Sequence, residues 1–286
     1  MATKQRGSGW SIKLVFNLYK VFGYKFIYFL MYPVTFFYFI FAHNVKDALK
    51  IYYKNIGVEF TNLKYYEHLR IFAITMVDRF ITRVDPKSYT YTYDDGDTPL
   101  EIFSKSTILL QSHFGGWASS ANVSRTTNKV HIVMQEALMD SIKEIEDSLD
   151  IKTNINIIDL NSGGLSVSIQ VANALMNNEV VAIMGDRPSS ENGKIDVDFF
   201  GKKASFNKNP FQIAYKMDKP ILVYFVIYKK MQQYKFEYLK IELDQDKPEE
   251  EAILEGVQKY VELYESYVRK YPNQWLNFYK FWDEEL

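Results

Sequence analysis

The chain has 286 residues, of which 47% are hydrophobic and 16% aromatic, enough to fill a large core. Its 34 basic and 35 acidic side chains leave a net charge of -1. This balance argues against a nucleic-acid binder, because neutralising phosphates needs a surplus of cations. The chain has no cysteine, which excludes disulfides, thiolate nucleophiles and cysteine-based zinc sites.

Residues 26–42, FIYFLMYPVTFFYFIFA, form an uncharged run dominated by aromatic side chains. The run is slightly shorter than the roughly 20 apolar residues that a spanning helix needs, and Pro33 interrupts it. We predict a membrane-associating helical segment over residues 1–50 that either spans the bilayer or lies on it, with a buried core helix as the alternative. A secretory signal peptide is not expected, because a small-residue cleavage site is missing. The flanking cations expected on anionic headgroups are Lys4, Arg6, Lys13, Lys20, Lys25, Lys46 and Lys50.

Residues 44–84 place apolar side chains every three or four positions, which predicts helices with a break at Gly57. After Pro86 the pattern changes to short apolar runs alternating with amphipathic stretches. This alternation predicts an α/β domain over residues 51–286, with a mostly parallel sheet flanked by helices. The predicted strands are 107–111, 130–134, 155–160, 180–185 and 220–228, and the predicted helices are 117–126, 137–149, 165–177 and 248–270.

A polar, glycine-containing stretch covers residues 189–209. We interpret it as a hairpin or lid over an apolar groove, or as a plain surface excursion. Its aromatic residues either line that groove or pack in the core; they are Phe199, Phe200 and Phe206.

The sequence QSHFGGWA at residues 111–118 follows the first buried-type strand. In open α/β sheets, ligands bind where strands end, so His113 is a candidate functional residue. Gly115 and Gly116 would let the backbone turn sharply beside a ligand. A helix starting near Trp117 would direct N–H groups toward a developing negative charge. Together these features favour a general base beside an oxyanion site, with a structural histidine as the alternative.

The other three histidines are weaker candidates. His43 and His68 fall in the helical front end, and His131 lies inside a predicted strand. No metal or cofactor is expected. Glu136 and Asp140 have a spacing that could hold a metal, but an acidic first helical turn explains them more simply.

Several blocks resemble the lysophospholipid acyltransferase superfamily, in the branch that contains the lipid A late acyltransferases. SHFGGWA resembles its first block, a histidine followed five residues later by an acid. VVAIMGDRP at 180–188 resembles its G-D-R block, and 197–223 resembles its F-F-G…P-V stretch. YPNQWLNFYKFW at 271–282 resembles the closing P-x-Q-W motif. FAITMVDRF at 72–80 and the aromatic N-terminus are similar to the branch associated with aryl-polyene and related lipid clusters.

The resemblance implies a glycerolipid acyltransferase-like fold and an acyltransferase at the cytoplasmic face of a bacterial inner membrane. The expected donor is an acyl carrier protein or coenzyme A thioester, and the expected acceptor is a lipid or glycolipid hydroxyl or amine. His113 would act as general base. Gly115, Gly116, Trp117 and Ala118 would bind substrate.

The chain departs from the family pattern at the fifth position after the histidine, where Ala118 replaces the acid. Losing such a carboxylate can cost about four orders of magnitude in rate. The alanine is an engineered replacement, or the acid comes from elsewhere, or the protein is a non-catalytic lipid-binding partner in a biosynthetic complex. Asp186 at the end of another strand is the best substitute acid, and Arg187 is placed to pair with a phosphate. The alternative for Asp186 and Arg187 is a structural ion pair.

Overall fold

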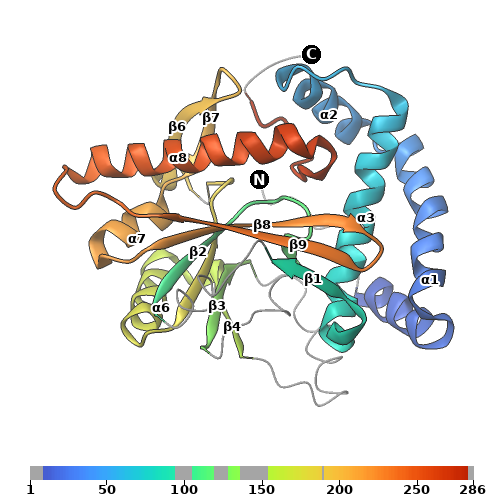
Figure 1. Cartoon of the computed structure of the whole chain (residues 1–286), viewed down its shortest axis with the longest axis horizontal. Helices are drawn as coiled ribbons and strands as arrows, with labels where there is room; N and C mark the ends of the chain where they lie inside the picture. The colour runs from blue at the N-terminus through green and yellow to red at the C-terminus, as the bar shows by residue number, and fades with distance from the viewer. Residues whose placement is uncertain (1–8, 94–104, 119–127, 136–153, 189, 283–286) are drawn as a thin grey trace.

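The computed structural model describes residues 9–93, 105–118, 128–135, 154–188 and 190–282 (Figure 1). Within these residues, helices precede, alternate with and follow the strands. The helices are α1 (Gly9–Phe41), α2 (His43–Asn55), α3 (Asn62–Val84), α6 (Gly164–Met176), α7 (Asn209–Met217) and α8 (Glu249–Lys270). The strands are β1 (Thr90–Tyr93), β2 (Thr107–Gln111), β3 (Val130–Met134), β4 (Ile155–Asp159), β5 (Val180–Met184), β6 (Lys194–Phe199), β7 (Lys202–Asn207), β8 (Ile221–Lys230) and β9 (Gln233–Ile241).

The main sheet has seven strands in the order β1-β9-β8-β2-β5-β3-β4. Strand β8 pairs antiparallel with β9, and the other described neighbours pair in parallel. Helices flank the sheet, with α8 running along one side of it and α1 and α3 together at one end (Figure 1). The predicted fold class, a mostly parallel sheet flanked by helices with an apolar N-terminal helix, is confirmed.

Strand β8 shows how the sheet separates two cores. Its first eight residues are all buried, which is why the sequence reads as a continuous apolar run. Because successive side chains point to opposite faces, Val223 and Phe225 join the core beneath α8, while Tyr224 and Val226 join the core that includes α1 and α3.

The front end of the chain forms three helices. Helix α1 continues through Pro33 and bends instead at Gly23, whose φ is 73° and ψ is 179°. A positive φ is open to glycine but strained for other residues, so the bend forms there. Helices α2 and α3 are separated at Gly57, as predicted, where φ is 71°.

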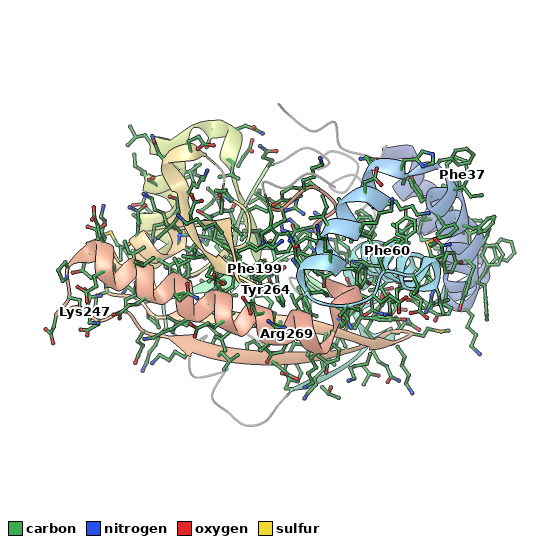
Figure 2. All side chains as sticks on the ribbon, turned by 90° about the horizontal axis from the view of Figure 1, so that it is seen from above. Phe37, Phe60, Phe199, Lys247, Tyr264 and Arg269 are labelled. Atoms are coloured by element: carbon green, nitrogen blue, oxygen red, sulfur yellow. The ribbon has the colours of Figure 1, made fainter. Side chains whose placement is uncertain are left out.

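Within the stretch 189–209, residues 194–207 form the antiparallel β6–β7 hairpin, one of the predicted alternatives. Its aromatic residues pack into the core: Phe199 and Phe206 are fully buried. Phe199 stacks on Tyr264 of α8 with 5.6 Å between ring centroids, and Figure 2 shows the two labelled side by side at the centre of the molecule. Phe199 also stacks on Trp282, with 5.4 Å between ring centroids. The hairpin is therefore anchored to α8 and the C-terminal segment.

Most of the predicted helix 117–126 and all of the predicted helix 137–149 lie outside the described residues. The predicted strands and the remaining helices agree with the structure to within two residues at each end.

Candidate active site

The carboxyl ends of β2 and β5 bring the candidate base and acid together. These strands pair in parallel with Gln111 opposite Met184. The Gly185 N–H donates to the Gln111 carbonyl at 2.8 Å, which continues this register past the strand ends. His113 lies two residues after Gln111, and Asp186 lies two residues after Met184. The two side chains therefore meet although they are 73 residues apart in the sequence.

Asp186 is fully buried and holds His113 through both the ring and the backbone. The His113 Nδ1–H donates to Asp186 Oδ1 at 3.0 Å, and the His113 backbone N–H donates to Oδ2 at 2.9 Å. The His113 side chain is 18% exposed. Its Nε2 has no hydrogen-bond partner among the described residues. The carboxylate therefore fixes one ring nitrogen and leaves the other to face a ligand.

The pair has the protonation states that a general base needs. Burial lowers the pKa of His113 below its ordinary 6.5, although the charge of Asp186 opposes this shift. Burial alone would raise the pKa of Asp186, but the charge and hydrogen bond of His113, with the nearby charge of Arg187, outweigh it and lower that pKa to about 2. At neutral pH the imidazole is neutral and the carboxylate ionised.

Asn277, which the sequence reasoning missed, completes the support of this pair. Its Nδ2 donates to Asp186 Oδ2 at 2.9 Å, and its Oδ1 accepts from Arg187 Nε at 2.5 Å. The backbone of its neighbour Leu276 donates to the His113 carbonyl at 2.7 Å. The residue lies three positions after Gln274 of the P-x-Q-W block, and that block was the signal that could have found it.

Arg187 lies beside the pair rather than bonded to it. Besides its bond to Asn277, its guanidinium lies over the Tyr279 ring, 5.1 Å from the centroid. The alternative interpretation from the sequence was a structural ion pair with Asp186. The Arg187 side chain instead donates hydrogen bonds to the Asn277 side chain and, at 3.4 Å, to the Leu276 carbonyl. Its charge nevertheless contributes to the low pKa of Asp186.

Gly115 and Gly116 let the histidine loop pack against β8 and β9. Gly115 has φ of 54°, and a Cβ there would lie 2.1 Å from the Val226 carbonyl oxygen. A Cβ on Gly116 would lie 2.3 Å from the Tyr234 ring. Both N–H groups are already engaged, Gly115 with the Gln274 carbonyl at 2.8 Å and Gly116 with Val226 at 2.7 Å. In this conformation the two glycines serve close packing, and their N–H groups point into the protein.

Trp117 and Ala118 lie in a 3-10 turn after the glycines. The Trp117 ring meets the His113 ring edge-on, with 5.0 Å between centroids. Both residues are half-buried. Trp117 thus forms one wall beside the imidazole.

The other histidines are held in structural contacts or stand apart. His68 is fully buried, accepts a hydrogen bond from Tyr53 and donates to the Trp275 carbonyl. Burial lowers the pKa of His68 to about 4, which keeps it neutral. His131 donates to Glu179 at 2.6 Å, and His43 is exposed on the front end.

No group of three or more histidine, aspartate or glutamate side chains that could hold a metal occurs in the described ranges. Glu136 and Asp140 lie outside those ranges.

These observations define an α/β protein with a histidine–aspartate pair at the carboxyl edge of a mostly parallel sheet. The family model for bacterial lipid A biosynthesis acyltransferases matches residues 103–284, more than half of the chain. The chain belongs to this family, which confirms the resemblance seen in its motifs. The family indicates a lipid A-type acyltransferase, with an acyl donor and a lipid acceptor. No curated protein sequence matches the chain.

Proposed function

We propose that the protein transfers a fatty acyl chain from an acyl carrier protein or coenzyme A thioester to a hydroxyl or amine of a lipid or glycolipid. The observation that carries this proposal is the His113 ring, whose Nδ1 is held by buried Asp186 while Nε2 is left for a ligand. A neutral imidazole oriented by a carboxylate is the arrangement that general-base catalysis uses.

In the proposed reaction, Nε2 of His113 takes the proton of the acceptor hydroxyl or amine. The acceptor oxygen or nitrogen attacks the thioester carbonyl carbon, and the tetrahedral intermediate collapses as the carbon–sulfur bond breaks. The imidazolium then returns its proton to the thiolate, so an ester or amide and a free thiol leave. Asp186 stabilises the imidazolium and fixes the tautomer of the ring.

Asp186 takes the part that the family pattern gives to the acid at the position of Ala118. The support for this assignment is the 3.0 Å contact to Nδ1 and the full burial of the carboxylate. Arg187 is proposed to pair with a phosphate of the donor or acceptor, since a guanidinium matches phosphate geometry. Trp117 and Ala118 are proposed to border the substrate, while the two buried glycines shape the loop that carries His113.

Acyl carrier protein and coenzyme A thioesters are cytoplasmic donors, so we place the reaction at the cytoplasmic face of a bacterial inner membrane. Helix α1 supports the membrane part, because Lys13–Phe41 is long and apolar enough to cross a bilayer and is the one such helix among the described residues. No cofactor takes part in the proposed reaction.

The test supplies purified protein with a radiolabelled acyl thioester and a bacterial membrane lipid extract, and measures labelled lipid. We expect wild-type transfer, none with His113→Asn, and a loss of about a thousandfold to ten-thousandfold with Asp186→Asn. Asp196→Asn is the matched control, because that carboxylate is exposed on the β6–β7 hairpin. Unchanged transfer in Asp186→Asn would remove Asp186 from the mechanism.

The second candidate function is a non-catalytic lipid-binding partner, and Ala118 is the observation that favours it. This function predicts neither transfer nor slow thioester hydrolysis by wild-type protein, with lipid binding retained. The codon at position 118 of the encoding gene shows whether the alanine is native.

A further inference from the structure

Helix α1 exposes one long apolar face. Twelve of the eighteen exposed large apolar side chains among the described residues belong to it. Their spacing of three and four residues places most of them on one side of the helix. They are Leu14, Val21, Phe22, Phe26, Phe29, Tyr32, Val34, Phe36, Phe37, Tyr38, Ile40 and Phe41.

The opposite face of α1 is bonded to α3 over most of its length. Tyr24, Ile27 and Met31 are buried there. The two helices run antiparallel, and the contacts follow in order. Tyr19 donates to Asp85 at 2.5 Å, Tyr24 to Asp78 at 2.6 Å, Arg70 to the Tyr28 hydroxyl at 2.9 Å, Tyr66 to the Tyr32 carbonyl at 3.1 Å, and Tyr65 to the Ala42 carbonyl at 3.2 Å.

These contacts with α3 limit the orientations that α1 can adopt in a membrane. A helix that crosses the bilayer must leave α3 or carry α3 with it. Carrying it would take the six charged residues of α3 into the bilayer, at about 2.5–3.5 kcal/mol for each basic or aspartate residue near the bilayer centre. Those residues are Lys64, Glu67, Arg70, Asp78, Arg79 and Arg83.

We propose that α1 lies flat in the headgroup region of an anionic phospholipid bilayer, with its aromatic face toward the acyl chains and α3 on the protein side. Figure 1 shows α1 on the outer side of α3, and Figure 2 shows Phe37 at the outer edge of the molecule. The occupant of this face is lipid because its aromatic composition suits the interface. Lys13, Lys20 and Lys25 are exposed along the same helix and complement anionic headgroups.

This inference rests on the proposed function, in which the acceptor is a membrane lipid. Its test measures vesicle binding and the depth of α1 in the bilayer rather than acyl transfer. The chain has no cysteine, so single-cysteine variants can each carry one fluorophore. Val21→Cys places a label on the segment before the bend at Gly23, and Phe29→Cys and Phe37→Cys place labels about 12 Å apart on the segment after it. Leu254→Cys on α8 is the control, because it is exposed on another element.

Labelled full-length proteins are mixed with phosphatidylcholine–phosphatidylglycerol vesicles that carry a quencher at a shallow or a deep acyl position. We expect blue-shifted emission at residues 21, 29 and 37, stronger quenching by the shallow probe at all three, and no change at 254. A gradient of depth from residue 21 to residue 37 would show a spanning helix and overturn the proposal. Unchanged emission, or a change that needs a second copy rather than lipid, would overturn it as well.

A binding measurement provides the second test. We expect at least a tenfold weaker vesicle partition for the triple variant Phe22→Ala, Phe29→Ala and Phe37→Ala. The matched control replaces three exposed apolar residues of α6, Leu165, Ile169 and Met176, by alanine and should bind like wild type. Equal binding by both triple variants would contradict the proposal. His113→Asn should bind normally, which separates failure of this inference from failure of the proposed reaction.

Discussion

In the proposed mechanism the residue at position 118 need not be an acid, because Asp186 already bonds one nitrogen of the His113 ring. A histidine ring has two nitrogens, and Asp186 bonds Nδ1 at 3.0 Å, so a second carboxylate could reach only Nε2. A carboxylate there would compete with the acceptor for the catalytic proton. The missing family acid is therefore compatible with activity in this chain.

We expect Ala118→Glu to change the acyl-transfer rate by less than about tenfold, because the orientation of the imidazole is already set. The measurement is the initial rate with a labelled acyl thioester over the pH range 5–9. A rise of several orders of magnitude would mean that the fifth position supplies the working acid, and Asp186 would then be a structural partner. Combining Ala118→Glu with Asp186→Asn separates the two cases, because a rescue by the introduced glutamate requires that its carboxylate reach the ring.

The glycines of the histidine loop allow a close approach that alanine would block. We expect Gly115→Ala to lower the free energy of unfolding by at least 1–3 kcal/mol, a typical cost of overpacking, because the new Cβ would lie 2.1 Å from a backbone oxygen. Gly163→Ala is the matched control: Gly163 also has a positive φ, of 90°, but its Cβ would meet nothing within 4 Å.

Chemical denaturation of both variants measures the difference. If Gly115→Ala is no less stable than Gly163→Ala, the positive φ alone accounts for the destabilisation, and the close contact with Val226 does not contribute to it.

At the scale of elements, a buried carboxylate joins the front end to the sheet. Asp78 of α3 accepts hydrogen bonds from Tyr24 of α1 at 2.6 Å, from Tyr89 at 2.7 Å, and from Tyr234 of β9. The Tyr234 ring in turn packs against Gly116. Burial raises the pKa of Asp78 to about 6, and the three tyrosine hydrogen bonds only partly oppose this shift.

Because its pKa is raised, Asp78 contributes to the stability of the fold in a way that depends on pH. The folded protein holds this proton more tightly than the unfolded chain, whose aspartate pKa is 3.8. The stabilisation is therefore complete below about pH 4 and is lost as the pH rises through 6. The pH dependence from Asp186 has the opposite sign. Because its pKa is lowered to about 2, its stabilisation of the fold is complete above about pH 3.8 and is lost as the pH falls through 2.

Wild type should lose the stabilisation from Asp78 between pH 4 and pH 7, whereas Asp78→Asn cannot. We therefore expect the variant to become more stable relative to wild type over this range, by at most about 3 kcal/mol in the free energy of unfolding. Denaturation in detergent at a series of pH values from 2 to 7 measures the trend for this variant and for its control. Asp186→Asn is the control, because its difference from wild type should change between pH 2 and pH 4 and in the other direction. A pH-independent difference for Asp78→Asn would refute the burial argument.

The sequence predicted those elements whose signal is local. Strand β8 was predicted because eight consecutive buried residues make a continuous apolar run. Strand β9 was missed although its signal is local too, since its tyrosine and phenylalanine alternate with lysine and glutamate as in a half-buried strand. The pairing of His113 with Asp186 followed from the rule that sites form at strand ends. The role of Asn277 did not follow from this rule. Its hydrogen bond to Asp186 joins residues 91 positions apart and depends on where the C-terminal segment packs against the sheet.

At the scale of the whole molecule, α1 shares a hydrophobic core cluster with α3 and the sheet. Tyr24, Ile27 and Met31 share a core cluster with Ile74 of α3 and with Tyr234 of β9. Helix α2 also runs across residue 50, where the sequence predicted a domain boundary. Burying each large apolar side chain contributes about 1.5–3 kcal/mol, and a typical protein has only about 5–15 kcal/mol of net stability.

We therefore expect the fragment 51–286 to lose the cooperative thermal transition that the full chain shows in detergent. Circular dichroism on heating measures this, with the variant Phe22→Ala, Phe29→Ala and Phe37→Ala as control. Those three side chains are exposed, so the control should keep its transition within a few degrees of wild type. A fragment that unfolds cooperatively near the full-length midpoint would instead show that residues 1–50 are a separable domain. Loss of the transition in the fragment alone would mean that residues 1–50, which include α1 and the first part of α2, complete the cores that the sheet separates.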